Sequence, residues 1–289
     1  ATVIGDRAVG NGAMSSDHNS LIGHYSGFQM TSGSQNTAYG SNSLAACTTG
    51  GTNVAIGYAA MDAATTTTSN VAVGANALGS LTVGGQNVAV GTEAGTNIST
   101  SDDNTAIGYN AMHGNDSTAG TGTGRNTGMG SSVLYAITTG QQNVAIGTSA
   151  GSTLTTTSHT VLIGHNAGLA INSADADGTV AIGMEAGKAI TSGQESVLIG
   201  RQAGQTLTTG DANTAVGHYA LYHNVTGNYN TAIGRGAGAR FLNAESTALG
   251  YYAGHYASGS YNTFVGSNAG QGGTTSAPYS SGIYNTFVG

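Results

Sequence analysis

Residues 53–57 read Asn-Val-Ala-Ile-Gly, and 17 positions later residues 70–74 read Asn-Val-Ala-Val-Gly. The same five-residue box, usually Asn-(Thr/Val)-Ala-(Ile/Val)-Gly, recurs along the whole chain of 289 residues, mostly at a spacing of 17. Self-similarity at a fixed period indicates a repeat architecture in which each repeat is one structural unit stacked on its neighbours. The box begins at residues 1, 19, 36, 53, 70, 87, 104, 126, 143, 160, 179, 196, 213, 230, 246, 262 and 285.

Each position of the box has its own chemistry. The fifth position is Gly in every copy, which indicates a positive φ or a neighbouring backbone that leaves no room for a Cβ. The second position is Thr or Val with the exception of Ser20, the third is usually Ala, and the fourth is apolar. In an extended strand, positions two and four lie on one face and positions three and five on the other. The box therefore predicts a short strand with one β-branched, apolar face and one small face.

The rest of the repeat is small and polar. Three residues beyond the box Gly comes another small residue, such as Ala60 after Gly57, followed by Gly or by a medium apolar residue such as Met61. This pattern predicts a second short extended segment after a turn, and the remaining Thr, Ser and Gly suit turns. Seventeen residues are too few for a propeller blade or a helix-containing leucine-rich unit. We therefore expect an all-β fold, a β-solenoid or β-roll of about 17 coils with a mostly 17-residue repeat, in which the box Asn residues form an amide ladder.

The repeat also predicts the domain organisation. Residues 1–289 are expected to form one continuous repetitive β-rod, and the absence of a visible capping segment at either end suggests a fragment of a longer fibre. Two longer intervals, residues 109–125 and 267–284, are expected to be insert loops. The small face has two interpretations. It either lets separate chains approach closely, which would make the fibre a homotrimer, or it lines the flat interior of a single-chain solenoid.

Composition excludes several classes of protein. The 49 Gly residues argue against a helical bundle, and the single Cys47 cannot support a disulfide scaffold. The formal net charge is −7 with only six Lys and Arg, so no nucleic-acid partner is expected. Because no run of about 20 apolar residues exists, no membrane insertion is expected either.

The boxes, and units such as residues 225–234 (Val-Thr-Gly-Asn-Tyr-Asn-Thr-Ala-Ile-Gly), resemble the repeats of bacteriophage tail-fibre proteins. They are also similar to the head repeats of trimeric autotransporter adhesins, which build a parallel β-roll from a related box. The resemblance covers essentially the whole chain, although the 17-residue period is longer than that of the adhesin heads. It implies a homotrimeric, fibrous protein of the virion tail fibre, extracellular, whose partners are other fibre or tail subunits and a host cell-surface glycan or protein. The alternative is a bacterial surface adhesin or extracellular fibre.

Motifs for catalysis are weak, and we expect no enzyme, no cofactor and no catalytic or metal-binding residue. Residues 147–151 match Gly-x-Ser-x-Gly, but equivalent positions in other coils lack the Ser, and no strand-to-helix context surrounds the match. Residues 183–188 depart from a phosphate loop in Gly spacing. The 13 Asp and Glu show no recurring pair of the kind that a glycan-degrading tail spike would need. The acidic residues at 102–103 and 175–177 are interpreted as solvated turn carboxylates rather than calcium ligands.

Two surface features remain for recognition. His24, His165 and His218 follow the box Gly in distant coils, which is typical of a variable exposed position. An ice-binding surface would need regular Thr arrays, and the Thr runs at residues 65–68 and 155–157 are local. Tyr is concentrated after residue 218, and Tyr offers a rigid apolar plate with a hydroxyl. The candidate receptor contacts are therefore Tyr251, Tyr252, Tyr256, Tyr261 and Tyr279.

Overall fold

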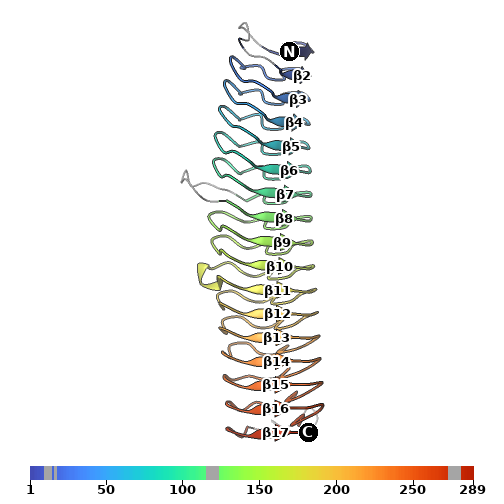
Figure 1. Ribbon diagram of the computed structural model, residues 1–289, viewed down its shortest axis with the longest axis vertical. Coiled ribbons are helices and arrows are strands. Elements are labelled where there is room, and N and C mark those ends of the chain that lie inside the picture. Colours follow the sequence, from blue (N-terminus) through green and yellow to red (C-terminus); the bar gives the residue numbers. More distant parts are fainter. Residues whose placement is uncertain (10–14, 16–17, 115–123, 273–280) are drawn as a thin grey trace. The chain divides into compact units, whose positions relative to one another are not determined.

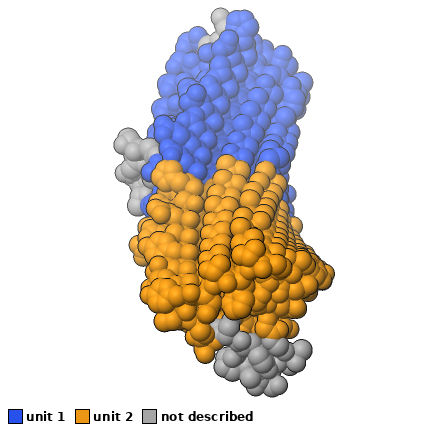
Figure 2. Space-filling model, turned by 60° about the horizontal axis from the view of Figure 1, so that its bottom comes forward, with its two compact units in different colours: residues 1–143 blue, residues 144–289 orange. Residues whose placement is uncertain are grey.

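The computed structural model describes residues 1–9, 15, 18–114, 124–272 and 281–289, which fold as an all-β protein. These residues group into two compact units, residues 1–143 and residues 144–289 (Figure 2). In the described residues no helix is long and apolar enough to cross a membrane, and the one helical element is the three-residue 3₁₀ turn η1 (Ala174–Ala176). Unit 1 contains strands β1 (Thr2–Ile4), β2 (Ser20–Ile22), β3 (Thr37–Tyr39), β4 (Val54–Ile56), β5 (Val71–Val73), β6 (Val88–Val90), β7 (Thr105–Ile107) and β8 (Thr127–Met129). Unit 2 contains β9 (Val144–Ile146), β10 (Val161–Ile163), β11 (Val180–Ile182), β12 (Val197–Ile199), β13 (Thr214–Val216), β14 (Thr231–Ile233), β15 (Thr247–Leu249), β16 (Thr263–Val265) and β17 (Thr286–Val288).

Each strand is formed by box positions two to four, and successive strands of a unit pair in parallel and in register (Figure 1). In unit 1, Val54 of β4 lies opposite Val71 of β5, and Ala55 lies opposite Ala72. In unit 2, the pairing of β13 with β14 follows the same rule. Equivalent residues therefore stack coil on coil, and the predicted β-solenoid with its 17-residue repeat is confirmed.

The invariant glycine meets both conditions that the sequence suggested. Gly57 has a φ of +136°, in the region that side-chain-bearing residues avoid. A Cβ at this position would lie 2.6 Å from the carbonyl carbon of Gly74, its equivalent in the next coil. The chain therefore turns out of each strand where the coils approach most closely, and only glycine fits there.

The box asparagines form the predicted ladder, and they form it in the interior. Asn53 is fully buried, and its Nδ2 donates to Oδ1 of Asn36 (3.1 Å) and to the carbonyl of Thr67 (2.9 Å). Its own Oδ1 accepts from the backbone N–H and Nδ2 of Asn70 (3.1 and 3.2 Å). In unit 2, Ser196 takes the same place, and its Oγ accepts from the backbone N–H of Asn213 (3.2 Å). Each rung thus satisfies a buried backbone donor of the next coil, which would otherwise cost about 1–3 kcal/mol.

The small face lines the interior of a single chain, which is the second of the two interpretations given above. The third box position is fully buried, as in Ala55 and Ala72, whereas positions two and four point outward. The expectation that the small face joins separate chains is therefore wrong. The physical reason is volume, because the opposite wall of the coil supplies the larger side chains.

That opposite wall comes from positions eight, nine and twelve, counted from the box Asn. Met61 at position nine and Ala64 at position twelve are fully buried in the β4 coil. Position twelve was not identified from the sequence as part of the core, although it is apolar in most coils. Its buried members include Met30, Cys47, Leu81, Ile98, Ile137, Leu154, Ile171, Ile190, Leu207 and Phe241.

Positions three and nine share one interior space. A large residue at position three occurs together with Gly at position nine of the same coil, because a Cβ on Gly168 would lie 2.7 Å from Cδ2 of Leu162. Where position three is Ala, position nine can be large, as in the pair Ala55 and Met61. Where both positions are small, as in Ala89 and Gly95, a neighbouring coil fills the space, because a Cβ on Gly95 would lie 2.9 Å from Cδ2 of Leu78. The large–Gly pairs are Leu21–Gly27, Leu162–Gly168, Leu198–Gly204 and Phe264–Gly270.

The predicted second extended segment is wrong. Positions six to eleven form a run of turns, in which Ala59 and Met61 have φ values of +52°. This left-handed backbone is incompatible with a strand. It is held by hydrogen bonds to both neighbouring coils, since the Ala59 N–H donates to the carbonyl of Ser41 (2.9 Å) and the Met61 N–H to that of Ala77 (3.0 Å). Inter-coil bonding outside the strands thus maintains a conformation that isolated residues would rarely adopt.

The insert loops are seen only in part. Residues 109–112 and 267–270 continue the run of turns, with left-handed φ at Asn110 (+54°) and Asn268 (+60°). Residues 113–114, 124–125, 271–272 and 281–284 of the predicted insertions are also described, whereas residues 115–123 and 273–280, and with them Tyr279, lie outside the described residues.

Candidate functional site

Two surfaces stand out on the described residues, and the first is the outward face of the strands. We call this the sheet face and define it by the side chains at box positions two and four. Position four exposes apolar groups, with Ile56 37% and Ile233 43% exposed. Position two contributes Thr or Val. In β13–β17 the position-two residues are all threonines that stack in register: Thr214, Thr231, Thr247, Thr263 and Thr286.

Only the threonine runs at residues 65–68 and 155–157 stood out in the sequence as candidates for a regular array. The stacked array lies at box position two rather than in the Thr-rich turns. A period of 17 residues brings a single Thr of each coil into one column, which a search for consecutive threonines does not find.

The second surface, the arginine–tyrosine corner, belongs to unit 2. It consists of the side chains that follow the box Gly in the coils of β12 to β15. Backbone hydrogen bonds place these residues on successive rungs, because Gly236 N–H donates to the carbonyl of His218 (2.8 Å) and Tyr252 N–H to that of Arg235 (2.9 Å). The corner comprises Arg201, His218, Tyr219, Tyr222, His223, Arg235, Arg240, Tyr251, Tyr252, His255 and Tyr256.

Guanidinium groups lie over the tyrosine rings of this corner. The Arg235 Cζ is 5.9 Å from the ring centre of Tyr251 and 5.7 Å from that of Tyr252. The Arg240 Cζ is 5.5 Å from the ring centre of Tyr256. Both arginines are exposed, and Tyr251 is 46% exposed. The cations are thus held above aromatic plates while their N–H groups remain accessible to solvent.

Three histidines lie among these arginines. Burial lowers the pKa of His218, and the charges of Arg201 and Arg235 lower it further. Burial and Arg240 act in the same direction on the pKa values of His223 and His255. The His255 Nδ1 lies 2.7 Å from the carbonyl oxygen of Gly236. The Nε2 of His218 is enclosed and has no hydrogen-bond partner among the described residues.

The structure brings together three of the predicted receptor contacts. Tyr251 and Tyr252 make an edge contact with ring centres 4.4 Å apart, and Tyr256 contacts His255 (4.4 Å), which contacts Tyr252 (4.6 Å). Tyr261 belongs instead to the turn before the following box. There it stacks on Tyr284 (4.9 Å), and Glu245 raises the pKa of its hydroxyl.

The arginines of the corner were not identified from the sequence. They could have been found by aligning the repeats and comparing equivalent positions. Three of the six Lys and Arg residues of the chain fall at position six or eleven of nearby repeats: Arg201, Arg235 and Arg240. Arg201 is far from the other two along the chain and comes close to them only when the repeats stack.

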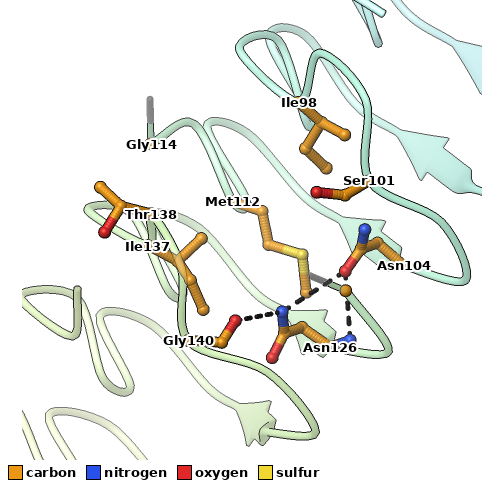
Figure 3. A pocket seen from close by; sticks show the side chains of 10 residues that line it. Ile98, Ser101, Asn104, Met112, Gly114, Asn126, Ile137, Thr138 and Gly140 are labelled. Atoms are coloured by element: carbon orange, nitrogen blue, oxygen red, sulfur yellow. Dashed lines mark hydrogen bonds between the residues drawn. The ribbon is translucent and has the colours of Figure 1, made fainter. Parts of the chain in front are cut away.

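A small internal void lies in unit 1, where Gly114 and Gly124 flank residues 115–123 (Figure 3). Its volume is about 20 Å³, which holds one water molecule. Met112 extends toward Asn126, whose Nδ2 donates to Asn104 Oδ1 (3.4 Å) and to the carbonyl of Gly140 (2.9 Å). A space of this volume is too small for an organic ligand.

The acidic turns have structural roles in the described residues. Asp102 Oδ1 accepts from Gly85 N–H (2.6 Å), and Asp177 Oδ1 accepts from Ser158 N–H (2.7 Å), so both carboxylates bond to the preceding coil. Ser149, from the Gly-x-Ser-x-Gly match, lies in the run of turns with a φ of +56°. Among the residues that the structure describes, no three His, Cys, Asp or Glu side chains gather as metal ligands. No protein-family model, curated protein or solved structure matches the chain.

Proposed function

We propose that the chain is a structural and adhesive segment of a bacteriophage tail fibre, in which stacked coils form a stiff shaft and one surface contacts the host. The observation that carries the proposal is the continuous hydrogen bonding between coils. Strands, asparagine ladder and turns all bond to the neighbouring coil. A solenoid of this kind gains length by adding coils, and its stability is a sum of contacts between neighbours. Such a scaffold suits a protein that spans distance on the virion surface.

The sheet face supports association into a homotrimer. Strands about 10 Å wide, stacked about 4.8 Å apart, give about 400 Å² of this face in each unit. Each unit therefore presents about half of the roughly 800 Å² that each partner buries in a specific protein interface. Within each unit, position four exposes apolar side chains such as Ile56 and Ile233, and an exposed apolar patch marks an interaction surface.

Particle mass tests this proposal directly. Three chains of 28.3 kDa give a particle of about 85 kDa, measured by light scattering after size exclusion. Ile233→Lys places a charge on the sheet face and is expected to yield monomers that keep the wild-type circular dichroism. Thr226→Lys, on an exposed turn, is the matched control and is expected to leave the mass unchanged. A wild-type mass of 28.3 kDa would contradict the trimer.

The neighbourhood and full length of the gene distinguish a tail fibre from a bacterial surface adhesin. Neighbouring tail genes and antibody labelling of virions are expected for a tail fibre, whereas a C-terminal membrane anchor in the full gene would favour a bacterial surface adhesin. Binding of the purified chain to host cells tests the adhesive role. Failure to bind any cell that the phage infects would count against that role.

A second candidate function follows from the threonine column of β13–β17. Threonines stacked in register beside the apolar residues of position four form a regular array, which is what an ice-binding surface needs. The particle mass separates the two functions, because a trimer covers the sheet face and a monomer exposes it. Thermal hysteresis of a monomeric chain, lost in Thr247→Lys, would favour ice binding.

A further inference from the structure

The arginine–tyrosine corner gathers three guanidinium groups on one surface of unit 2. Elsewhere in the chain, Lys188 Nζ lies 2.9 Å from Glu185 Oε1, and Arg125 Nε lies 3.8 Å from Asp103 Oδ2. Within the described residues, Arg201, Arg235 and Arg240 form no ion pair. These are half of the six basic residues in a chain with a net charge of −7. Unpaired guanidiniums gathered on one surface of an acidic protein call for an anionic ligand.

The rungs space these cations regularly. Position six holds Arg201, His218, Arg235 and Tyr251 on four successive coils, and coils rise about 4.8 Å each. Arg201 and Arg235 are therefore about 10 Å apart along the coil axis, counted as two rungs. That is about the repeat of two sugar units in an extended glycan. A ligand with one charge on every second residue would match this column.

The tyrosines add apolar plates next to the charges. A Cβ on Gly236 would lie 2.5 Å from Cδ1 of Tyr252, so the glycine makes room for this ring to lie against the preceding coil. The imidazole ring of His255 makes an edge contact with the Tyr252 ring, with 4.6 Å between the ring centres. A tyrosine plate stacks on the C–H face of a pyranose and donates its hydroxyl, whereas the guanidinium beside it forms paired hydrogen bonds to carboxylate or sulfate.

Nucleic acid is a poorer fit to the same surface. Affinity for a phosphate backbone rises with the number of phosphates that Lys and Arg neutralise. Three arginines on a chain of net charge −7 neutralise few. The histidines add little positive charge at neutral pH, because burial and the arginines lower their pKa values.

We propose that the arginine–tyrosine corner is a binding site for an acidic glycan, a chain of sugars that bears carboxylate or sulfate groups. Arg201, Arg235 and Arg240 bind the anionic groups, and Tyr251, Tyr252 and Tyr256 stack on the sugar rings. This site rests on the proposed adhesive function and specifies its ligand class.

The experiment measures binding of the full chain to four probes by biolayer interferometry. The probes are a hexuronic acid oligosaccharide, the same oligosaccharide with its carboxyls reduced to alcohols, a sulfated oligosaccharide and a DNA duplex. Binding of the uronic acid or the sulfated probe is expected, and which of the two binds identifies the anionic group. The carboxyl-reduced probe is expected to bind at least about tenfold more weakly, because it loses the charge-assisted hydrogen bonds.

Variants then locate the site. Arg235→Gln combined with Arg240→Gln is expected to lower affinity for the acidic probe at least about tenfold. Tyr252→Ala is expected to weaken binding of the acidic probe as well. Arg125→Gln removes a charge from unit 1 and is the matched control, with affinity unchanged. Circular dichroism of each variant confirms the fold.

Several results would overturn the proposal. One is that the carboxyl-reduced probe binds as tightly as the acidic probe that binds best, and another is that neither acidic probe binds. The others are that the double arginine variant keeps the wild-type affinity, or that DNA binds more tightly than either acidic probe. Cell binding by a chain that binds neither acidic probe would refute the acidic-glycan site and leave the adhesive function standing. A chain that binds neither cells nor an acidic probe would refute both the acidic-glycan site and the adhesive function.

Discussion

Replacing Asn53 by Ala tests whether the buried ladder holds the coils together. The side chain accepts the backbone N–H of Asn70 (3.1 Å) and donates to the carbonyl of Thr67 (2.9 Å). Its removal leaves both backbone groups buried without these partners. The orphaned Asn70 N–H costs about 1–3 kcal/mol, whereas the Thr67 carbonyl still accepts the Gly51 N–H (3.2 Å) and loses one hydrogen bond worth about 0.5–1.5 kcal/mol. The unfolding free energy should therefore fall by about 1.5–4.5 kcal/mol.

Two further variants make the result specific to the ladder. Asn53→Ser keeps an acceptor for the Asn70 N–H, as Ser196 Oγ does for the next coil, so about half of the loss is expected. Thr66→Ala, on an exposed turn of the same coil, should change stability by less than about 0.5 kcal/mol.

Urea unfolding followed by circular dichroism gives the free energies, and amide hydrogen exchange shows where the loss occurs. Exchange should accelerate at Asn70 and in the adjoining coils and remain unchanged in distant ones, since each coil contacts only its neighbours. The reasoning is refuted if Asn53→Ala is no more destabilising than Thr66→Ala, or if the Asn70 amide stays as protected as in the wild type.

Three further perturbations follow from the same coordinates. Ala55→Leu should cost about 1–3 kcal/mol by overpacking, and adding Met61→Gly should restore part of that loss; equal effects with and without Met61 would contradict the shared interior space. Gly57→Ala combines a φ of +136° with a clash against the next coil, so we expect a loss of about 3–5 kcal/mol, and near-native stability would disprove the close approach. The hydrogen bond that Lys188 donates to Glu185 lowers the pKa of this carboxyl in the folded protein. The ionised Glu185 therefore stabilises the fold fully above its unfolded pKa of about 4.3, and this contribution is lost as the pH falls through its pKa in the folded protein. Acid titration of unfolding should therefore show a smaller loss between about pH 5 and pH 3 for Glu185→Gln than for the wild type.

Much of the fold was predictable because the relevant signals are local and recur. The φ requirement of Gly57, the strand preference of Val54 and the self-pairing of Asn53 are properties of single residues or of one residue and its copy. The run of turns was not predictable in the same way. Ala59 and Met61 adopt left-handed φ values only because carbonyls of the coils on both sides accept their N–H groups.

The candidate site was predictable in part. Tyrosine enrichment pointed to Tyr251, Tyr252 and Tyr256, which do lie together. It also grouped Tyr261 with them, although that ring stacks on Tyr284 in a different turn. Clustering along the chain does not distinguish the corners of a coil, because Tyr256 is as close in sequence to Tyr261 as it is to Tyr251, yet Tyr261 lies in a different turn.

The sequence alone determined the period, the short strands, the glycine positions and the asparagine ladder, since each repeats at fixed spacing and requires only an identical neighbour. The tertiary structure alone decided which face of the strand lies inside. Hydrophobicity would favour Val54 and Ile56 for the interior, but the folded coil buries Ala55 and Met61 fully and leaves Ile56 37% exposed. It also decided where Arg235 lies relative to the tyrosines, because closure of the coil brings together side chains that the linear order separates.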